Sequence, residues 1–155
     1  MLPALCAALM LAACADADPF SQRTSEQPVP LSNVAVPGEV TDEYGNGSDH
    51  VYFETDSASL VPEAQQVLQK QAAWLQVFPQ HAVTIEGHAD ERGTREYNLA
   101  LGERRAQAVV NYLTALGIDP KRLKTISYGK ERPICTEPNE ACWAQNRRGV
   151  STLDN

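Results

Sequence analysis

Positive charge is scarce in this chain. Its 155 residues include 13 lysines and arginines against 20 aspartates and glutamates, which gives a formal net charge of −7 at pH 7. Proteins that bind the phosphate backbone of nucleic acids are usually basic, so this charge balance argues against a nucleic-acid binder. It also argues against adhesion to anionic lipid head groups through surface charge. If the protein sits at a membrane, another device must hold it there.

A hydrophobic run long enough to span a membrane is also missing. Residues 1–13 (MLPALCAALMLAA) are apolar, but a transmembrane helix needs roughly 20 such residues. The run suits the apolar part of an export signal, although no lysine or arginine precedes it, as is usual in such signals. Cys14 follows directly, and the block LAAC resembles the lipobox of bacterial lipoproteins. This interpretation predicts a lipid on Cys14; an ordinary signal peptide with an incidental cysteine is the alternative.

The sequence after the apolar run divides into a polar segment and a folded domain. Residues 14–48 are rich in Pro, Ser, Asp, Glu, Asn and Gly and show no periodicity, which predicts a flexible tether behind the lipidated cysteine. Ala15, rather than an aspartate, follows Cys14, and among bacterial lipoproteins this resembles the sorting signal for the outer membrane. Residues 49–155 carry the periodic patterns, and we expect them to form one domain.

Cysteine is rare enough to be considered residue by residue. Of the four cysteines, Cys6 lies in the apolar run, and Cys135 and Cys142 stand close together in ICTEPNEACW. An oxidising periplasm favours a disulfide between this pair. Half of a zinc site and a pair of free thiols are the alternatives. The zinc interpretation is the weaker one because no second Cys or His pair lies nearby at ligand spacing.

Periodic patterns in the domain alternate between strand and helix. Runs of alternating or β-branched residues end at turn formers, and longer runs show apolar residues at helical spacing. We expect strands at residues 50–54, 82–86, 123–128 and 149–153, and helices at residues 62–78 and 96–116. The order β-α-β-α-β-β predicts an α+β sandwich with the helices packed on one face of a mixed sheet. Which strands run parallel stays open.

On the second predicted helix, the neighbouring residues Arg104 and Arg105 face different surroundings. At about 100° per residue, one stripe collects the residues that should face the core: Leu99, Gly102, Ala106, Val109, Val110 and Leu113. Arg104 points nearly opposite this stripe, toward solvent. Arg105 lies about 80° from the centre of the stripe, on its margin beside Asn98 and Leu101. A half-desolvated guanidinium makes stronger hydrogen bonds than an exposed one, so Arg105 is the better ligand candidate.

The stretch GHADERGTREYNLALGERR, from Gly87 to Arg105, joins the second strand to this helix. Asp90 lies on a turn at the strand end, where binding residues are common. The alternative role for Asp90 is that of a turn residue that accepts hydrogen bonds from nearby backbone amides. Arg92 points to the same site or pairs with Glu91 at the surface. Asp90 together with Arg105 would complement a ligand that carries both an ammonium group and a carboxylate. This arrangement favours binding over chemistry.

The same stretch does not present a complete catalytic set, and although paired carboxylates could serve glycoside hydrolysis, nothing singles out such a pair. His88, Asp90 and Glu91 could form an acid–base cluster, but no Ser or Cys nucleophile accompanies them. No second histidine completes a metal triad. His88 is more simply a packed or hydrogen-bonding residue of the loop. We therefore expect no enzyme activity, no metal site and no cofactor.

One family combines these motifs: GHADERGTREYNLALGERRAQAVVNYL, with YFETDS before it and SYGKERP and AQNRRGV after it. The combination closely resembles the peptidoglycan-associated lipoproteins, the lipidated members of the group that shares the C-terminal domain of outer membrane protein A (OmpA). The resemblance runs from about Val51 to the C-terminus. It implies an OmpA-like periplasmic domain that binds peptidoglycan non-covalently, through meso-diaminopimelate of the stem peptide.

The resemblance also implies roles for single residues. Asp90 and Arg105 would grip the zwitterionic end of the ligand. The full set of expected ligand contacts is Phe53, Asp90, Arg92, Asn98, Leu101 and Arg105. Arg147 and Arg148 match the family pattern too, and for at least one of them we expect a structural role, such as tying the last strand to the ligand loop.

Partners and location follow from the same resemblance. The protein is expected at the outer membrane, held by its lipid, with the domain facing the periplasm and bound to peptidoglycan. The resemblance implies the Tol system as a partner, chiefly the propeller protein TolB, in competition with the wall. It also implies a part in envelope integrity and in outer-membrane constriction during cell division. Another OmpA-like wall-binding lipoprotein outside the Tol system is the alternative.

Overall fold

The computed structural model describes residues 49–154. The predicted signal peptide (1–13) and the predicted tether with its lipidated Cys14 (14–48) lie outside these residues. In chain order the elements are β1 (His50–Tyr52), α1 (Pro62–Val77), β2 (Val83–His88), α2 (Arg95–Ala115), the short 3-10 helix η2 (Pro120–Arg122), β3 (Leu123–Gly129), α3 (Glu140–Asn146) and β4 (Arg148–Leu153). Across the described part of the chain, none of the helices has the length and apolarity needed to cross a membrane.

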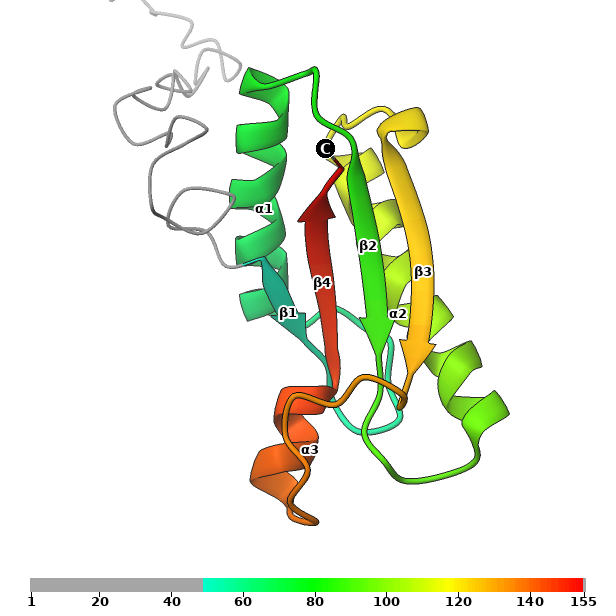
Figure 1. Ribbon diagram of the computed structural model, residues 1–155. Helices are drawn as coiled ribbons and strands as arrows, with labels where there is room; N and C mark the ends of the chain where they lie inside the picture. Colours follow the sequence, from blue (N-terminus) through cyan, green and yellow to red (C-terminus); the bar gives the residue numbers. More distant parts are fainter. Residues whose placement is uncertain (1–48, 155) are drawn as a thin grey trace, which may run out of the picture. The chain divides into compact units, whose positions relative to one another are not determined.

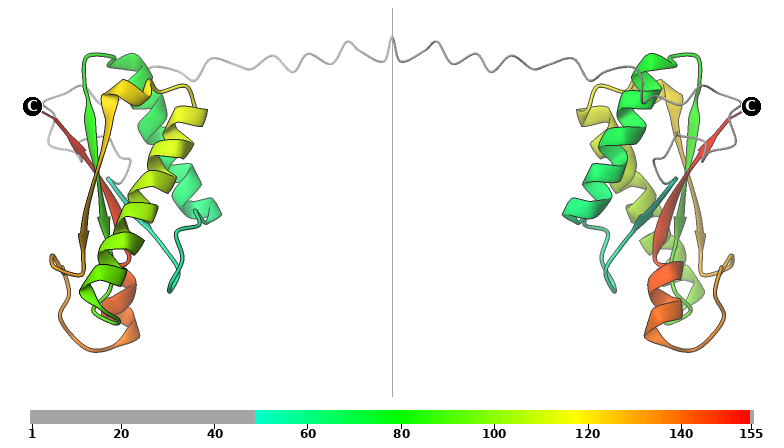
Figure 2. Two further views of the ribbon diagram at one scale, coloured as in Figure 1. Left: turned by 90° about the vertical axis from the view of Figure 1, so that its right-hand side faces the viewer. Right: turned by 90° about the vertical axis from the view of Figure 1, so that its left-hand side faces the viewer.

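Within residues 49–154, four strands form a mixed sheet in the order β1-β4-β2-β3. β2 and β3 run parallel, whereas β4 lies between β1 and β2 and runs antiparallel to both (Figure 1). The parallel pair needs a crossover, which α2 provides. Figure 2 shows α1 and α2 together on one side of the sheet. The predicted α+β fold, with helices on one face of a mixed sheet, is confirmed.

Apart from the short η2 and shifts of one or two residues at several ends, the structure differs from the predicted elements in two places. The helix α3 lies in the segment that we expected to be only a loop closed by the cysteines; Asn139 caps it and accepts a hydrogen bond from the Cys142 amide at 2.9 Å. A helix of seven residues has too few turns to show a periodic apolar pattern. The first strand ends at Tyr52 instead of residue 54, because its partner β4 begins opposite it at Arg148.

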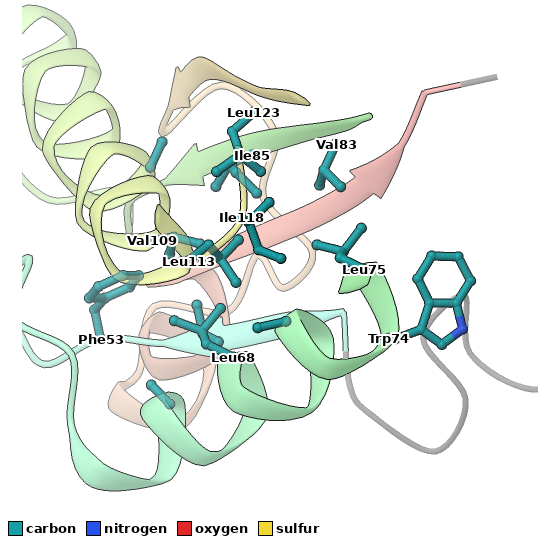
Figure 3. Close-up of a cluster of buried hydrophobic side chains, with 14 residues drawn as sticks. Phe53, Leu68, Trp74, Leu75, Val83, Ile85, Val109, Leu113, Ile118 and Leu123 are labelled. Atoms are coloured by element: carbon teal, nitrogen blue, oxygen red, sulfur yellow. The ribbon is translucent and has the colours of Figure 1, made fainter. Parts of the chain in front are cut away.

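The core fills the space between the two long helices and the sheet. Val83 and Ile85 alternate along β2 and are 0% exposed, because they point toward the helices. Leu68 and Leu75 of α1 and Leu113 of α2 meet them there and are also 0% exposed (Figure 3). Burying each such side chain contributes roughly 1.5–3 kcal/mol. This packing fixes β2 and α2, the two elements that flank the site described below.

Two glycines let α2 approach β2 closely. A Cβ atom at Gly87 would lie 1.9 Å from the carbonyl oxygen of Gly102, and a Cβ atom at Gly102 would lie 2.3 Å from the Oγ of Ser127. No larger residue fits at either position without a shift of the backbone. The structure confirms Gly102 on the core-facing side of α2. The contact holds the beginning of α2 against the end of β2.

Candidate ligand-binding site

A pocket of about 310 Å³ opens where β2 ends and α2 begins. Three segments line it: the turn after β1, the loop after β2 and the first turns of α2. Its lining residues are Thr55, Asp56, Asp90, Arg92, Gly93, Tyr97, Asn98 and Leu101. The structure thus brings four of the expected ligand contacts together in one pocket: Asp90, Arg92, Asn98 and Leu101. Phe53 and Arg105 lie beside or beneath it.

Asp90 and Arg92 form a bidentate ion pair in the pocket wall. Arg92 donates from Nε to Oδ1 of Asp90 at 3.0 Å, from Nη2 to Oδ2 at 2.7 Å and from its backbone amide to Oδ1 at 3.1 Å. Nη1 of Arg147 lies 3.6 Å from Oδ2. Burial alone raises the pKa of Asp90, but the hydrogen bonds and charge of Arg92 outweigh it and hold the pKa below its ordinary value. Asp90 is therefore a carboxylate at neutral pH.

Arg92 leaves part of its guanidinium open to the pocket. Its side chain is 39% exposed, and Nη2 also reaches the Thr55 hydroxyl at 3.5 Å. Within residues 49–154, Nη1 of Arg92 has no hydrogen-bond partner. Of the two orientations left open by the sequence, the structure shows the one toward Asp90. Arg92, which lines the pocket, therefore keeps one free donor in addition to its hydrogen bonds with the carboxylate of Asp90.

Arg105 lies beneath the pocket, and the prediction that it sits half-desolvated on the margin of α2 is wrong. The side chain is 0% exposed. It donates from Nε to the Ser57 carbonyl at 2.8 Å, from Nη1 to the His88 carbonyl at 2.8 Å and from Nη2 to the Glu54 carbonyl at 3.0 Å. The turn after β1 covers this side of α2. Burial lowers the pKa of Arg105 to about 10, so it stays charged at neutral pH. Arg104 is exposed, as predicted.

Phe53 faces the core. Its ring is 4% exposed and packs among the buried side chains between helices and sheet (Figure 3). The guanidinium carbon of Arg105 lies 5.2 Å from the centre of this ring, and Nε of Arg147 donates to the Phe53 carbonyl at 3.0 Å. Phe53 therefore supports two arginines from below.

The start of α2 is shaped by the same loop. Thr94 caps the helix, and its hydroxyl accepts a hydrogen bond from the Tyr97 amide at 3.2 Å. Gly93 has a φ of +89°, a conformation that favours glycine. The side chain of Asn98 is buried and donates to the Arg92 carbonyl at 2.8 Å, and Lys130 donates to the Gly93 carbonyl at 2.7 Å. These contacts fix the backbone that carries Arg92.

Four side chains contribute to this site although the sequence did not single them out: Thr55, Asp56, Tyr97 and Trp143. Asp56 and Tyr97 both line the pocket, and the Tyr97 hydroxyl donates to the Asp56 carboxylate. Trp143 of α3 places its ring 4.2 Å from the guanidinium carbon of Arg92. Thr55, Asp56 and Trp143 lie far along the chain from the stretch of residues 87–105, and within that stretch no pattern distinguishes Tyr97 from its neighbours. The expected tie between the last strand and the ligand loop is made by Arg147, through Phe53 and Asp90.

His88 is not part of the pocket. It is 1% exposed and packs on Tyr128, with ring centres 5.5 Å apart. Burial, with the charges of Arg148 and Arg132, lowers the pKa of His88 to about 4. The acid–base cluster considered from sequence therefore does not assemble around Asp90. In the part of the chain that the structure describes, no group of three His, Cys, Asp or Glu side chains is placed to hold a metal ion.

Known proteins share both the sequence motifs and the fold of this chain. It belongs to the OmpA family, whose model matches residues 52–147. Within that family its relatives are peptidoglycan-associated lipoproteins, as its motifs predicted. The protein of that name from Agrobacterium fabrum is 48% identical over 150 residues, which cover 97% of this chain and 85% of the relative. The one from Brucella melitensis is 51% identical over 123 residues, covering 79% of this chain and 73% of the relative.

A solved structure agrees with these sequence relatives. The crystal structure of the peptidoglycan-associated lipoprotein from Burkholderia pseudomallei matches with a TM-score of 0.66 at 45% identity, covering 68% of this chain and 89% of that one. The similarity therefore extends from the motifs to the fold that positions the pocket.

Proposed function

We propose that this protein is an outer-membrane lipoprotein whose domain binds peptidoglycan non-covalently, through meso-diaminopimelate of the stem peptide. The observation that carries the proposal is the pair of Asp90 and Arg92 in a pocket of about 310 Å³. Diaminopimelate presents an ammonium group and a carboxylate on one carbon, which is the inverse of this pair. The names of the relatives support the same ligand class.

In the proposed complex, Asp90 accepts hydrogen bonds from the ammonium group and the free Nη1 of Arg92 donates to the carboxylate. Asp56 adds a second carboxylate to the pocket. Arg105 acts from beneath, because its three hydrogen bonds hold the carbonyls of the surrounding loops. Asn98 and Leu101 shape the wall, and Phe53 supports Arg105.

The affinity of the proposed complex can be estimated from these contacts. Hydrogen bonds to charged groups contribute about 1.5–3 kcal/mol each. Three of them, less the cost of immobilising the ligand, give an affinity of roughly micromolar order. A wall with many identical stem peptides and an array of anchored proteins would strengthen binding further through avidity.

The placement at the membrane belongs to the same proposal. Residues 1–13 would serve as the signal peptide, Cys14 would carry the lipid, and residues 14–48 would span up to about 110 Å as a taut tether. We further propose that TolB competes for the domain, in a Tol system that acts in envelope integrity and outer-membrane constriction. Simultaneous, independent binding of TolB and wall fragments would contradict this competition. A wall-binding lipoprotein outside the Tol system is the alternative, which partner pull-downs would distinguish.

Sedimentation with purified cell-wall sacculi tests the ligand. We expect the protein to sediment with sacculi that contain meso-diaminopimelate and to remain largely in solution with sacculi that contain lysine at that position, because lysine lacks the second carboxylate. Equal sedimentation with both would contradict recognition of the zwitterionic end. Release of soluble wall fragments during the incubation would indicate a hydrolase and contradict pure binding.

A further inference from the structure

The cysteine-closed segment between β3 and β4 is tied into one unit next to the pocket. A disulfide joins Cys135 to Cys142, the third residue of α3. Asn146, at the other end of α3, accepts hydrogen bonds from the amides of Ile134 and Cys135 at 2.9 and 3.2 Å and donates to the Cys135 carbonyl at 2.7 Å. A helix this short is not stable by itself in water. Its position therefore depends on these ties.

From this unit, Trp143 reaches the loop that carries Asp90 and Arg92. Its ring lies 4.2 Å from the guanidinium carbon of Arg92, and its indole Nε1 donates to the Glu91 carboxylate at 2.9 Å. Figure 1 shows α3 at the end of the sheet where β2 ends and β4 begins. Arg92 is thus held between an aromatic face and the carboxylate of Asp90.

This contact matters because Arg92 is the exposed member of the ion pair. Its side chain is 39% exposed, whereas that of Asp90 is 9% exposed. Exposed ion pairs contribute little, since holding a long side chain in one geometry costs entropy and water screens the charge. An aromatic face over the guanidinium favours one rotamer and leaves the edge with Nη1 directed away from Asp90.

We propose that Trp143 is a positioning residue for the ligand pocket: held by the Cys135–Cys142 disulfide, it keeps Arg92 ordered, with Nη1 free for the carboxylate of the ligand. The inference rests on the proposed function. Without Trp143, the ligand must order Arg92 on binding. Immobilising one such side chain corresponds to a roughly 2- to 12-fold change in affinity.

Calorimetric titration with a soluble muropeptide that contains meso-diaminopimelate tests the proposal on the full chain. We expect Trp143→Leu to raise the Kd about fivefold. Trp143→Phe retains a ring face and should stay within about twofold of the unaltered protein. Tyr52→Leu removes an exposed aromatic that does not line this pocket and serves as the matched control.

A double-mutant cycle shows whether Trp143 acts through Arg92. In an Arg92→Ala background, Trp143→Leu should cause no further loss, because the group it positions is gone. The paired replacement Cys135→Ala and Cys142→Ala should weaken binding like Trp143→Leu in the normal background and have no effect in the Arg92→Ala background. This pair also provides the test if Trp143→Leu does not fold.

The outcomes separate the two proposals. Failure of the unaltered protein to bind the muropeptide would overturn the proposed function. Normal binding that Trp143→Leu and the paired cysteine replacement leave unchanged would overturn only the positioning role. Equal losses with and without Arg92 would also overturn it, because Trp143 would then act on the ligand directly.

Discussion

Replacement of Arg105 by alanine is expected to destabilise the fold strongly. The loss in the free energy of unfolding should exceed the binding free energy that any single ligand contact contributes. The guanidinium is 0% exposed and donates to the carbonyls of Glu54, Ser57 and His88. Removing one partner from a buried charged network costs about 3–5 kcal/mol, since the remaining groups lose their hydrogen bonds without regaining water. We expect the free energy of unfolding to fall by about 4 kcal/mol, a large share of the roughly 5–15 kcal/mol typical of a domain.

The Arg105→Lys variant distinguishes the contribution of the positive charge to stability from that of the hydrogen-bond geometry. Lysine keeps the positive charge but has no planar fork, so it cannot reach all three carbonyls at once. We expect a loss of about 2 kcal/mol, intermediate between the unaltered protein and Arg105→Ala. Arg104→Ala is the matched control, because its side chain is exposed and its loss should stay within about 0.5 kcal/mol.

Urea unfolding followed by tryptophan fluorescence measures these differences, and circular dichroism provides a second probe of two-state behaviour. If Arg105→Ala unfolds at the same urea concentration as the unaltered protein, the reasoning from burial and three hydrogen bonds is refuted. A stable Arg105→Ala variant that no longer binds the wall would instead assign Arg105 a role in ligand binding rather than in folding.

Two further predictions concern the scaffold around the pocket. Gly87→Ala should lower the free energy of unfolding by about 3 kcal/mol, because its Cβ would lie 1.9 Å from the Gly102 carbonyl oxygen; an unchanged melting temperature would contradict the close approach. His88 has its pKa lowered from 6.5 to about 4, so between these pH values the unfolded chain binds a proton that the folded chain does not. The His88 contribution to the free energy of unfolding should therefore fall by about 3 kcal/mol as the pH drops from about 6.5 to about 4. Urea midpoints across this range should show a slope that His88→Phe reduces, the remainder near pH 4 coming from carboxylates such as Asp90 whose pKa is lowered in the folded chain; a slope unchanged by His88→Phe would contradict the assignment.

The regular part of the fold could be predicted because burial on one side of an element leaves a period in the sequence. The alternation that ends at Gly87 and the small residues at Gly102 and Ala106 follow directly from the face that each element turns to the core. The helix α3 left no such period, since seven residues complete only two turns.

The complete burial of the Arg105 side chain could not be predicted from the helix wheel. The wheel compares positions on one helix, but the groups that bury Arg105 belong to residues 54–57, about 50 positions earlier in the chain. The same limit applies to Trp143, which meets Arg92 only after the chain has passed through β3 and returned. Asp90 and Arg92 lie in one pocket, as their closeness in the sequence suggested, but the sequence left open whether Arg92 turns to Asp90 or to Glu91.

Titration of a meso-diaminopimelate muropeptide into the purified protein and its Asp90→Asn variant bears directly on the wall-binding proposal. Asparagine keeps the size of the side chain but removes the charge that is meant for the ammonium group, and its amide nitrogen replaces one of the two oxygens that accept hydrogen bonds from Arg92. Losing one charge-assisted hydrogen bond corresponds to at least about a tenfold increase in Kd. We predict that increase for Asp90→Asn and an unchanged Kd for Arg104→Ala. Equal affinity of Asp90→Asn and the unaltered protein would contradict the assignment of this pocket.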